Sequence, residues 1–252
     1  MAGKNKGLFK HTLDQWVSTV LEMNDLEMQV IGLLLPFTGL RVKEFIHFHG
    51  PTWLSWKGDG SDTTYGEIPV MKVPARANCF RKGANGPCNL CESNDGGKFE
   101  TKYDDERTIP LVETWKNHGA TDKEQFVEQD LPLRELTRTY FKVSRSDVGN
   151  ELIGGDGLSA NTVNKKLKQI GQKAQLDFER ELIESHYSCF DKPIPNINPH
   201  DMRGTFIMQL MRNNMQRTKV IGYTGHDHVS SLAPYEERLA KEINAKEFLD
   251  HI

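Results

Sequence analysis

Pro199-His200-Asp201-Met202-Arg203-Gly204-Thr205-Phe206 is the stretch of this sequence on which the interpretation of the rest depends. We expect a helix from Pro199 to Asn213, and in a helix His200 and Arg203, three residues apart, lie on one face. Such a pair can hold one phosphate oxygen from two sides. The pattern H-x-x-R is too short to be specific by itself, so its meaning depends on the motifs on either side of it.

The segment downstream holds a second histidine motif and a tyrosine. His226, in Gly225-His226-Asp227-His228, lies 23 residues after Arg203, and Tyr235 follows His226 by nine residues. Each of these positions, taken alone, has an ordinary structural explanation, since tyrosine often packs in a core. We expect His228 to be incidental.

Upstream, Thr38-Gly39-Leu40-Arg41-Val42-Lys43-Glu44 places an arginine directly after an apolar segment. A helix is expected from Leu26 to Phe37 and should stop at Thr38-Gly39, because glycine suits a helix C-terminus. An arginine held there can direct its planar fork of donors into a cleft, which suits a phosphate. The alternative is a surface arginine paired with Glu44.

A lysine between two expected strands is the remaining candidate. Lys102 precedes the strand that begins at Arg107. A lysine on such a hairpin can reach a scissile bond and supply a proton. Lys98 competes for this role, and an ordinary hairpin lysine is the structural alternative.

Together, these positions resemble the active-site order of the tyrosine recombinase (phage integrase) family, within which an archaeal or viral type is one alternative. Both spacings after Arg203 are similar to those of typical members, and residues 34–44 resemble the family's first arginine box. Gly204 departs from the pattern, because many members carry a second histidine there, but that position is variable. The resemblance identifies these candidate catalytic residues: Arg41, Lys102, His200, Arg203, His226 and Tyr235.

The resemblance implies a site-specific DNA recombinase, or integrase, that cuts and rejoins double-stranded DNA by transesterification. Tyr235 would attack the scissile phosphate and form a 3′-phosphotyrosine, which keeps the strand resealable. Free tyrosine has a pKa of about 10, so His200 would act as base. Lys102 would protonate the departing 5′-oxygen.

The same resemblance assigns charge stabilisation to Arg41, Arg203 and His226, which would bind the non-bridging phosphate oxygens in the transition state. Glu44 is expected to orient a neighbouring catalytic group. This chemistry requires no metal or other cofactor.

The remaining pattern predicts an α+β fold that is mainly α, with one small three-stranded antiparallel sheet. Strands are expected at 52–56, 68–73 and 107–112, and the chain after 112 reads as mainly helical, with Ser159 as a candidate N-cap. The expected organisation is a flexible basic tail over 1–9, a single catalytic domain over 10–252, a Cys-containing loop insertion at about 75–101 and a tail helix at about 236–250.

The cysteines indicate a metal site. Cys79, Cys88 and Cys91 form a C-x8-C-x2-C cluster, and outside oxidising compartments such a cluster more often binds metal than forms disulfides. The three could hold a structural zinc with a fourth ligand, either Cys189 or a histidine. Three free thiols are the alternative.

Composition places the chain among ordinary globular proteins. Apolar residues make up 37% and charged residues 27% of the 252 residues. No apolar run approaches the roughly 18 residues of a membrane span, and the N-terminus does not resemble a secretory signal, so we expect a cytoplasmic protein without a membrane partner. The net charge of −3 counts mildly against DNA binding, but local basic stretches such as 165–168 can supply a patch, or can be solvated helix faces.

The motif Thr38-Gly39-Leu40-Arg41 of the first arginine box lies so near the start of the sequence that we expect no room before it for the core-binding domain of most family members. We therefore expect a catalytic domain alone, a fragment, or a chain that acts with a separate DNA-binding chain. The amphipathic tail, with Leu239, Ile243 and Phe248, resembles family tails that dock on a neighbouring subunit. This implies a homo-oligomer on DNA, and packing on its own domain is the alternative.

Two other functions fit parts of the pattern. A type IB topoisomerase-like enzyme would use similar chemistry to relax supercoils without a specific site. A DNA-binding regulator with an unused active site would bind DNA without cutting it.

Overall fold

The computed structural model describes residues 7–8, 10–48, 54–55, 70–79, 86–111, 114–117, 127–130, 133, 136, 158–179 and 197–250. The chain divides into two compact units. We call Met1–Phe45 with Ser159–Ile252 the helical unit, and Ile46–Leu158 the sheet unit. That residues 10–252 act as a single domain stays a prediction.

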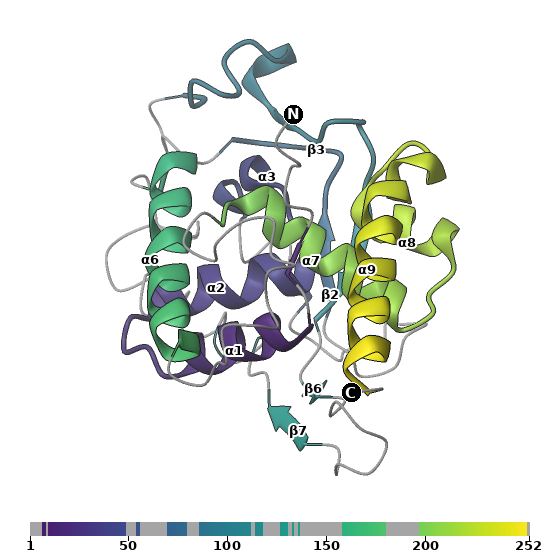
Figure 1. The fold of residues 1–252 in the computed structure, drawn as a ribbon. Helices are drawn as coiled ribbons and strands as arrows, with labels where there is room; N and C mark the ends of the chain where they lie inside the picture. Colours follow the sequence, from purple (N-terminus) through teal and green to yellow (C-terminus); the bar gives the residue numbers. More distant parts are fainter. Residues whose placement is uncertain are drawn as a thin grey trace, which may run out of the picture. The chain divides into compact units, whose positions relative to one another are not determined.

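The helical unit contains the segments that carry the two arginine motifs. Figure 1 shows α7 between α6 on one side and α8 and α9 on the other, and α7 contacts each of the three. A short helix, α3 (Val42–Ile46), crosses the boundary into the sheet unit. In the described part of the chain, the helices of this unit besides α3 are α1 (Lys10–Leu21), α2 (Leu26–Thr38), α6 (Ala160–Glu179), α7 (Pro199–Arg212), α8 (Arg217–Thr224), the 3-10 helix η5 (Val229–Leu232) and α9 (Ala233–Asp250).

Helix α2 forms the centre of this unit. Every residue from Val30 to Thr38 is buried, and α1, α6 and α7 all pack against the helix. A helix that is apolar around its whole circumference must be covered on all sides, so its own sequence places α2 in the interior. The Asp25 carboxylate begins the helix by accepting a hydrogen bond from the Met28 N–H at 3.0 Å.

Pro36 and the C-terminal end of α2 each leave a backbone carbonyl that another helix satisfies. Pro36 has no N–H, so the carbonyl of Gly32, four residues earlier, loses its helical partner. The buried Trp16 of α1 donates its indole Nε1–H to this Gly32 oxygen at 2.8 Å. The Pro36 oxygen accepts from Gln209 Nε2 of α7 at 2.8 Å. Hydrogen bonds as well as apolar contacts therefore join α1, α2 and α7.

The Trp16 bond can be tested by a double-mutant cycle. Trp16→Phe should destabilise the protein by about 1–3 kcal/mol from the orphaned Gly32 carbonyl alone, with a further loss from the smaller ring. In a Pro36→Ala background the new N–H can bond Gly32, so Trp16→Phe should cost about 1 kcal/mol less. Urea unfolding of the four proteins measures both effects, and equal costs in the two backgrounds would contradict this role of the indole.

The first turns of α6 and α7 are fixed by side-chain caps. Ser159 accepts from the Thr162 N–H at 3.1 Å, which confirms the predicted N-cap of α6. At α7, Asn198 Oδ1 accepts from the N–H groups of His200 and Asp201 at 3.0 and 3.2 Å, and Asp201 Oδ2 accepts from the Asn198 N–H at 3.1 Å. This reciprocal capping box, followed by proline, determines where α7 begins.

Two residues of the expected N-terminal tail pack on the helical unit. Leu8 is 5% exposed, and its N–H donates to Thr205 Oγ1 at 2.8 Å. The Gly7 oxygen accepts from Arg238 Nε of α9 at 2.9 Å. The backbone of Gly7 lies so close to Gly204 that a Cβ at position 7 would sit 2.6 Å from the Gly204 carbonyl carbon. Gly7 and Leu8 therefore differ from the flexible tail that composition predicts, while residues 1–6 and 9 lie outside the described residues.

The sheet unit contains the predicted three-stranded antiparallel sheet. Its strands are β1 (Leu54–Ser55), β2 (Val70–Val73) and β5 (Arg107–Pro110), in the order β1-β2-β5. Leu54 pairs with Met71, and Met71 pairs with Ile109 on its other side. Met71, Val73 and Ile109 are fully buried.

The predicted loop insertion contains a second ladder. The strands β3 (Arg76–Ala77) and β4 (Phe99–Glu100) pair antiparallel, and the 3-10 turn η2 (Asp95–Gly97) precedes β4. The ladders β2–β5 and β3–β4 follow one another along a single hairpin. On one side only residues 74–75 separate β2 from β3, whereas on the other side residues 101–106 separate β4 from β5 and form a turn that interrupts the hairpin. A two-residue strand is too short for side-chain alternation to reveal it in sequence.

The expectation of mainly helical structure after residue 112 is wrong for one segment. The strands β6 (Thr114–Asn117) and β7 (Val127–Asp130) form a two-stranded antiparallel sheet. Four residues give no decisive period, and β-branched and aromatic residues such as Thr114 and Trp115 suit a strand. Farther along the chain, Leu133 and Leu136 are helical, and the other residues from 131 to 157 lie outside the described residues.

None of the helices in the described part of the chain is both long enough and apolar enough to cross a lipid bilayer.

Candidate active site

Arg203 is held at the interior of the helical unit by two backbone carbonyls. It lies in the second turn of α7 and is 3% exposed. Its Nη1 donates to the Gly39 oxygen at 2.7 Å, and its Nη2 donates to the Thr224 oxygen. Gly39 follows α2 and Thr224 ends α8. A planar fork that bonds two carbonyls from two different helices has little freedom to rotate.

Arg41 is oriented by a buried carboxylate and a third carbonyl. Glu44 is 1% exposed; its Oε1 accepts from Arg41 Nη1 at 3.0 Å and its Oε2 from the Arg41 backbone N–H at 2.6 Å. Arg41 Nη2 donates to the Gly225 oxygen at 2.8 Å. The Arg41–Glu44 pair that the sequence offered as a surface alternative is thus formed and orients the Arg41 side chain. The separate bond to the Gly225 oxygen connects Arg41 to the end of α8.

Two left-handed glycines make this arrangement possible. Gly39 caps α2 with φ of 63°, and Gly225 caps α8 with φ of 59°. Only glycine adopts this region without cost. At both positions the helix ends, and its last carbonyl oxygens accept hydrogen bonds from the guanidinium groups of Arg41 and Arg203. These oxygens lie at the negative ends of the α2 and α8 dipoles, which favours positive charge there.

His226 is joined to the same helix end. Its Nδ1 lies 2.7 Å from Thr224 Oγ1, and its backbone N–H donates to the Ile221 oxygen at 3.2 Å. The Thr224 hydroxyl lies 2.7 Å from the Val220 oxygen. Thr224 therefore contacts His226 through its side chain and Arg203 through its carbonyl. His228, two residues on, is exposed.

Tyr235 lies in the first turn of α9 and is 4% exposed. It packs in a cluster with Ile207, Met208, Val220 and Leu232. Burial raises the pKa of Tyr235; the positive charges of Arg203 and Arg41 oppose this shift, whereas Asp201 adds to it. The hydroxyl therefore keeps its proton at neutral pH, and attack by its oxygen needs a base.

His200 is exposed in the first turn of α7, one turn before Arg203. The cap at Asn198 holds its backbone. The helical unit thus brings Arg41, Arg203 and His226 together around the ends of α2 and α8, and the charges of both arginines act on Tyr235.

Lys102 lies in the sheet unit, on the turn that interrupts the hairpin. Its ammonium sits 4.8 Å from the centre of the Tyr103 ring, and the side chain is exposed. The turn is braced by Thr101, whose N–H donates to the Ala75 oxygen at 2.9 Å, and by Arg76, whose Nε lies 3.0 Å from Asp104 Oδ1. Lys98, the competing candidate, is also exposed, directly before β4.

Sequence reasoning expected Glu44 to orient a neighbouring catalytic group, but it missed the backbone groups that position the arginines. The carbonyl oxygens of Gly39, Thr224 and Gly225 carry no side-chain signature. The helix-ending glycines were the available signal, and sequence used it only at Gly39. The capping role of Asp201 was also missed, although Asn-Pro-x-Asp at 198–201 is a recognisable cap pattern.

The three clustered cysteines meet a histidine that sequence did not single out. Cys79, Cys88, Cys91 and His47 lie in the sheet unit, with their ligand atoms all within 4.8 Å of one another. None of the three cysteines forms a disulfide bond. Cys189, the other predicted fourth ligand, lies outside the described residues.

The chain resembles solved structures of tyrosine recombinases at low identity. Against the XerH site-specific recombinase bound to difH substrate in a pre-cleavage complex, identity is 14% and the TM-score 0.55, over 96% of this chain and 55% of that one. Against the XerA recombinase, identity is 16% and the TM-score 0.54, over 91% of this chain and 59% of that one. Against the Tn1549 transposon integrase in complex with transposon right end DNA, identity is 16% and the TM-score 0.56, over 92% of this chain and 62% of that one.

These similarities show the fold of a tyrosine-recombinase catalytic domain, mainly helical with a small antiparallel sheet, as predicted. The chain spans less than two thirds of the length of each of these neighbours. No family model matches the sequence, and no curated protein matches it.

Proposed function

We propose that this protein is a site-specific DNA recombinase that cuts and rejoins double-stranded DNA through a covalent bond to Tyr235. The observation that carries the proposal is that Arg41, Arg203 and His226 lie together at the ends of α2 and α8. The positive charges of both arginines also lower the pKa of Tyr235, against the larger effect of burial. These residues are up to 194 positions apart, from 41 to 235, and they converge within a fold shared with known recombinases.

The chemistry follows from the charges of the site. The Tyr235 oxygen attacks the scissile phosphorus, its proton passes to a base, and the bond from phosphorus to the 5′-oxygen breaks as the phosphotyrosine bond forms. Negative charge grows on the non-bridging oxygens, where the guanidinium groups of Arg41 and Arg203 stabilise it. Both groups are held in place before substrate arrives, so little reorganisation is needed at the moment of reaction.

Two proton transfers complete the step. We assign the base to His200, which lies exposed one turn before Arg203, and the acid to Lys102, which lies on an exposed turn braced by Thr101 and Arg76. The reverse reaction with a new 5′-hydroxyl reseals the strand, and the bond energy stays stored in the phosphotyrosine.

DNA and protein partners follow as expectations of the same proposal. Lys165, Lys168 and Lys173 are exposed on α6, whereas Lys166 is held at 2.6 Å from Glu27. Exposed lysines of this kind supply the salt-dependent contacts to phosphates. Association on DNA through the end of α9, and action with a separate DNA-binding chain, remain predictions. Helix α9 packs on α7 of the same chain, with Tyr235 of its first turn in one cluster with Ile207 and Met208.

A covalent trap tests the proposal. The full chain is incubated with a library of nicked duplexes of random sequence, in which cleavage next to the nick releases a short fragment and prevents resealing. Denaturing electrophoresis isolates the adduct, and mass spectrometry locates the modified residue. We expect an oligonucleotide on Tyr235, at recurring sequences.

Tyr235→Phe is the matched control, since it removes only the nucleophilic oxygen. It should bind the library as the parent does and form no adduct. An adduct at another residue, or binding without any adduct, would contradict the proposal, and the latter would favour a DNA-binding regulator. Adducts without sequence preference, together with relaxation of supercoiled plasmid, would favour a topoisomerase.

A further inference from the structure

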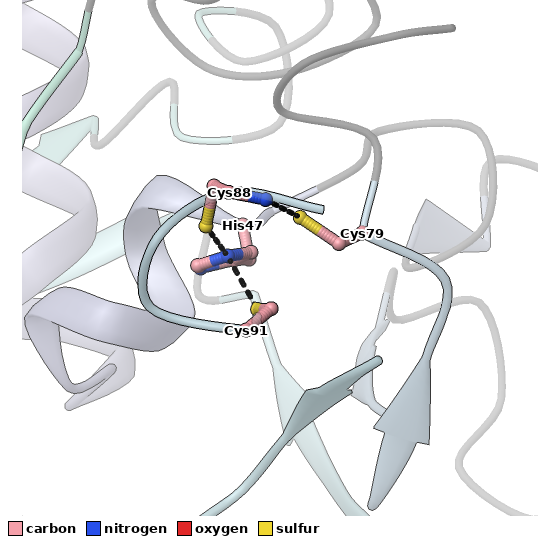
Figure 2. A group of neighbouring side chains, drawn as sticks. All are labelled: His47, Cys79, Cys88 and Cys91. Carbon is pink, nitrogen blue, oxygen red and sulfur yellow. Dashed lines mark hydrogen bonds between the residues drawn. The ribbon is translucent and has the colours of Figure 1, made fainter. Parts of the chain in front are cut away.

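The four side chains of His47, Cys79, Cys88 and Cys91 present nitrogen and sulfur atoms to one point. His47 Nε2 lies 3.3 Å from Cys88 Sγ and 3.2 Å from Cys91 Sγ. Figure 2 shows the imidazole between these two sulfur atoms, with Cys79 approaching from the segment after β3. The residues come from three places: the end of α3, the end of β3 and the loop before η2.

Hydrogen bonding alone explains this geometry poorly. One ring nitrogen has either one hydrogen or one lone pair, directed along a single line in the ring plane. Two sulfur atoms nevertheless lie within 3.3 Å of the same Nε2. A cation bonded to Nε2 and to both sulfurs would satisfy all three atoms together.

The dimensions fit a tetrahedral ion. With Zn–S near 2.3 Å and Zn–N of about 2.0–2.1 Å, tetrahedral angles place ligand sulfurs roughly 3.8 Å apart and a sulfur and nitrogen roughly 3.6 Å apart. The four ligand atoms here lie within 4.8 Å of one another, so small side-chain movements complete the tetrahedron.

The described part of the loop that carries two of the ligands, residues 86–98, buries no large apolar side chain of its own. From residue 86 to 98 the buried side chains are those of Cys88 and Cys91, while Leu90 is 47% exposed. The Cys91 and Glu92 N–H groups both donate to the Cys88 oxygen, at 2.8 and 2.9 Å, and this tight turn brings the two thiols of the C-x2-C pair to one side. His47 is 4% exposed and stacks at 5.0 Å from Phe99 of β4.

We propose that His47, Cys79, Cys88 and Cys91 bind a structural Zn²⁺ that fastens the loop between β3 and β4 to the segment following α3. Three thiolates and an imidazole are a soft donor set that suits zinc, and four protein ligands close the coordination sphere, as in structural sites. The ion orders the loop end of the interrupted hairpin, and in the sequence only β4 separates this loop from the turn that carries Lys102.

Metal analysis of the full chain tests this site independently of any DNA reaction. We expect one zinc ion per chain after purification, and the visible absorption of a tetrahedral thiolate complex after exchange with Co²⁺. Cys189→Ser should leave both readouts unchanged. His47→Ala and Cys91→Ser should each lose most of the bound metal.

A variant that keeps four ligands guards against a failure to fold. His47→Cys should retain Co²⁺ and change its absorption to that of a four-thiolate site, which a merely structural histidine would not do. The site is overturned if the parent chain takes up no stoichiometric zinc or cobalt, if His47→Cys leaves the cobalt spectrum unchanged, or if Cys189→Ser removes the metal.

Discussion

Arg203→Lys is expected to reduce the rate of covalent DNA cleavage by about 10²–10³-fold, the effect of removing a preorganised donor from a developing anion. The guanidinium of Arg203 donates to the Gly39 and Thr224 oxygens together. An ammonium is a point charge on a flexible stem and cannot span two carbonyls on different helices while also presenting a donor to phosphate.

The substitution should also lower stability. Arg203 is 3% exposed, and a buried carbonyl left without its partner costs about 1–3 kcal/mol. DNA binding should change little, because phosphate contacts elsewhere provide most of the non-specific affinity. Measuring adduct formation, unfolding in urea and DNA affinity on the same preparation separates the three effects.

Arg212→Lys is the matched control on the same helix. Arg212 lies at the end of α7, and its Nη2 donates to the Leu8 oxygen at 3.2 Å. Arg212 lies nine residues after Arg203, at the other end of α7. The rate of covalent cleavage by this variant should therefore stay within a few fold of the parental rate. Cleavage by Arg203→Lys at close to the parental rate would show that the fork is not required.

Gly39→Ala should be strongly destabilising, by about 2–5 kcal/mol in total. Gly39 has φ of 63°, where a residue with a Cβ costs about 1–2 kcal/mol. The added Cβ would also lie 2.4 Å from Cδ1 of the Phe206 ring, and overpacking of a buried site costs about 1–3 kcal/mol. Because the Gly39 oxygen accepts from Arg203, any shift that relieves the clash also moves the guanidinium.

Gly222→Ala provides the comparison for this prediction. Gly222 lies within α8, and a Cβ there meets nothing within 4 Å. Alanine at an unstrained helical position should stabilise the protein by about 0.5–1 kcal/mol. Free energies of unfolding from urea titrations decide the matter, and equal losses in the two variants would contradict a specific role for the left-handed cap at Gly39.

Helix boundaries and buried faces were the parts of the fold that local sequence could predict. Gly39 ends α2 and Ser159 begins α6 as expected, because caps depend on a few neighbouring residues. The short ladders β3–β4 and β6–β7 were not predicted, since strands of two to four residues show no reliable alternation. Gly7 and Leu8 were assigned to a tail by composition, which does not reveal a contact with α7 almost 200 residues away.

The candidate catalytic residues could be chosen from sequence through their order and spacing, but their geometry could not. Arg41 and Arg203 were predicted to bind phosphate from their residue type and their place in the motif order. Only the structure showed that backbone oxygens at the ends of two helices orient the two guanidinium groups. Likewise, the cysteine spacing predicted a metal, while His47 was one of nine histidines without a distinguishing pattern.

The sequence by itself determined the chemical groups of this protein, the helices that carry most of them, the three-stranded sheet and the cysteine cluster, because residue type, capping and apolar period are properties of neighbouring residues. The tertiary structure alone decided which groups meet. Trp16 donates to the Gly32 carbonyl that has no helical partner because of Pro36, Arg203 lies between the ends of α2 and α8, and His47 lies among the thiols. Such contacts depend on the packing of segments far apart in the chain, and backbone carbonyls, which every residue has, accept many of them.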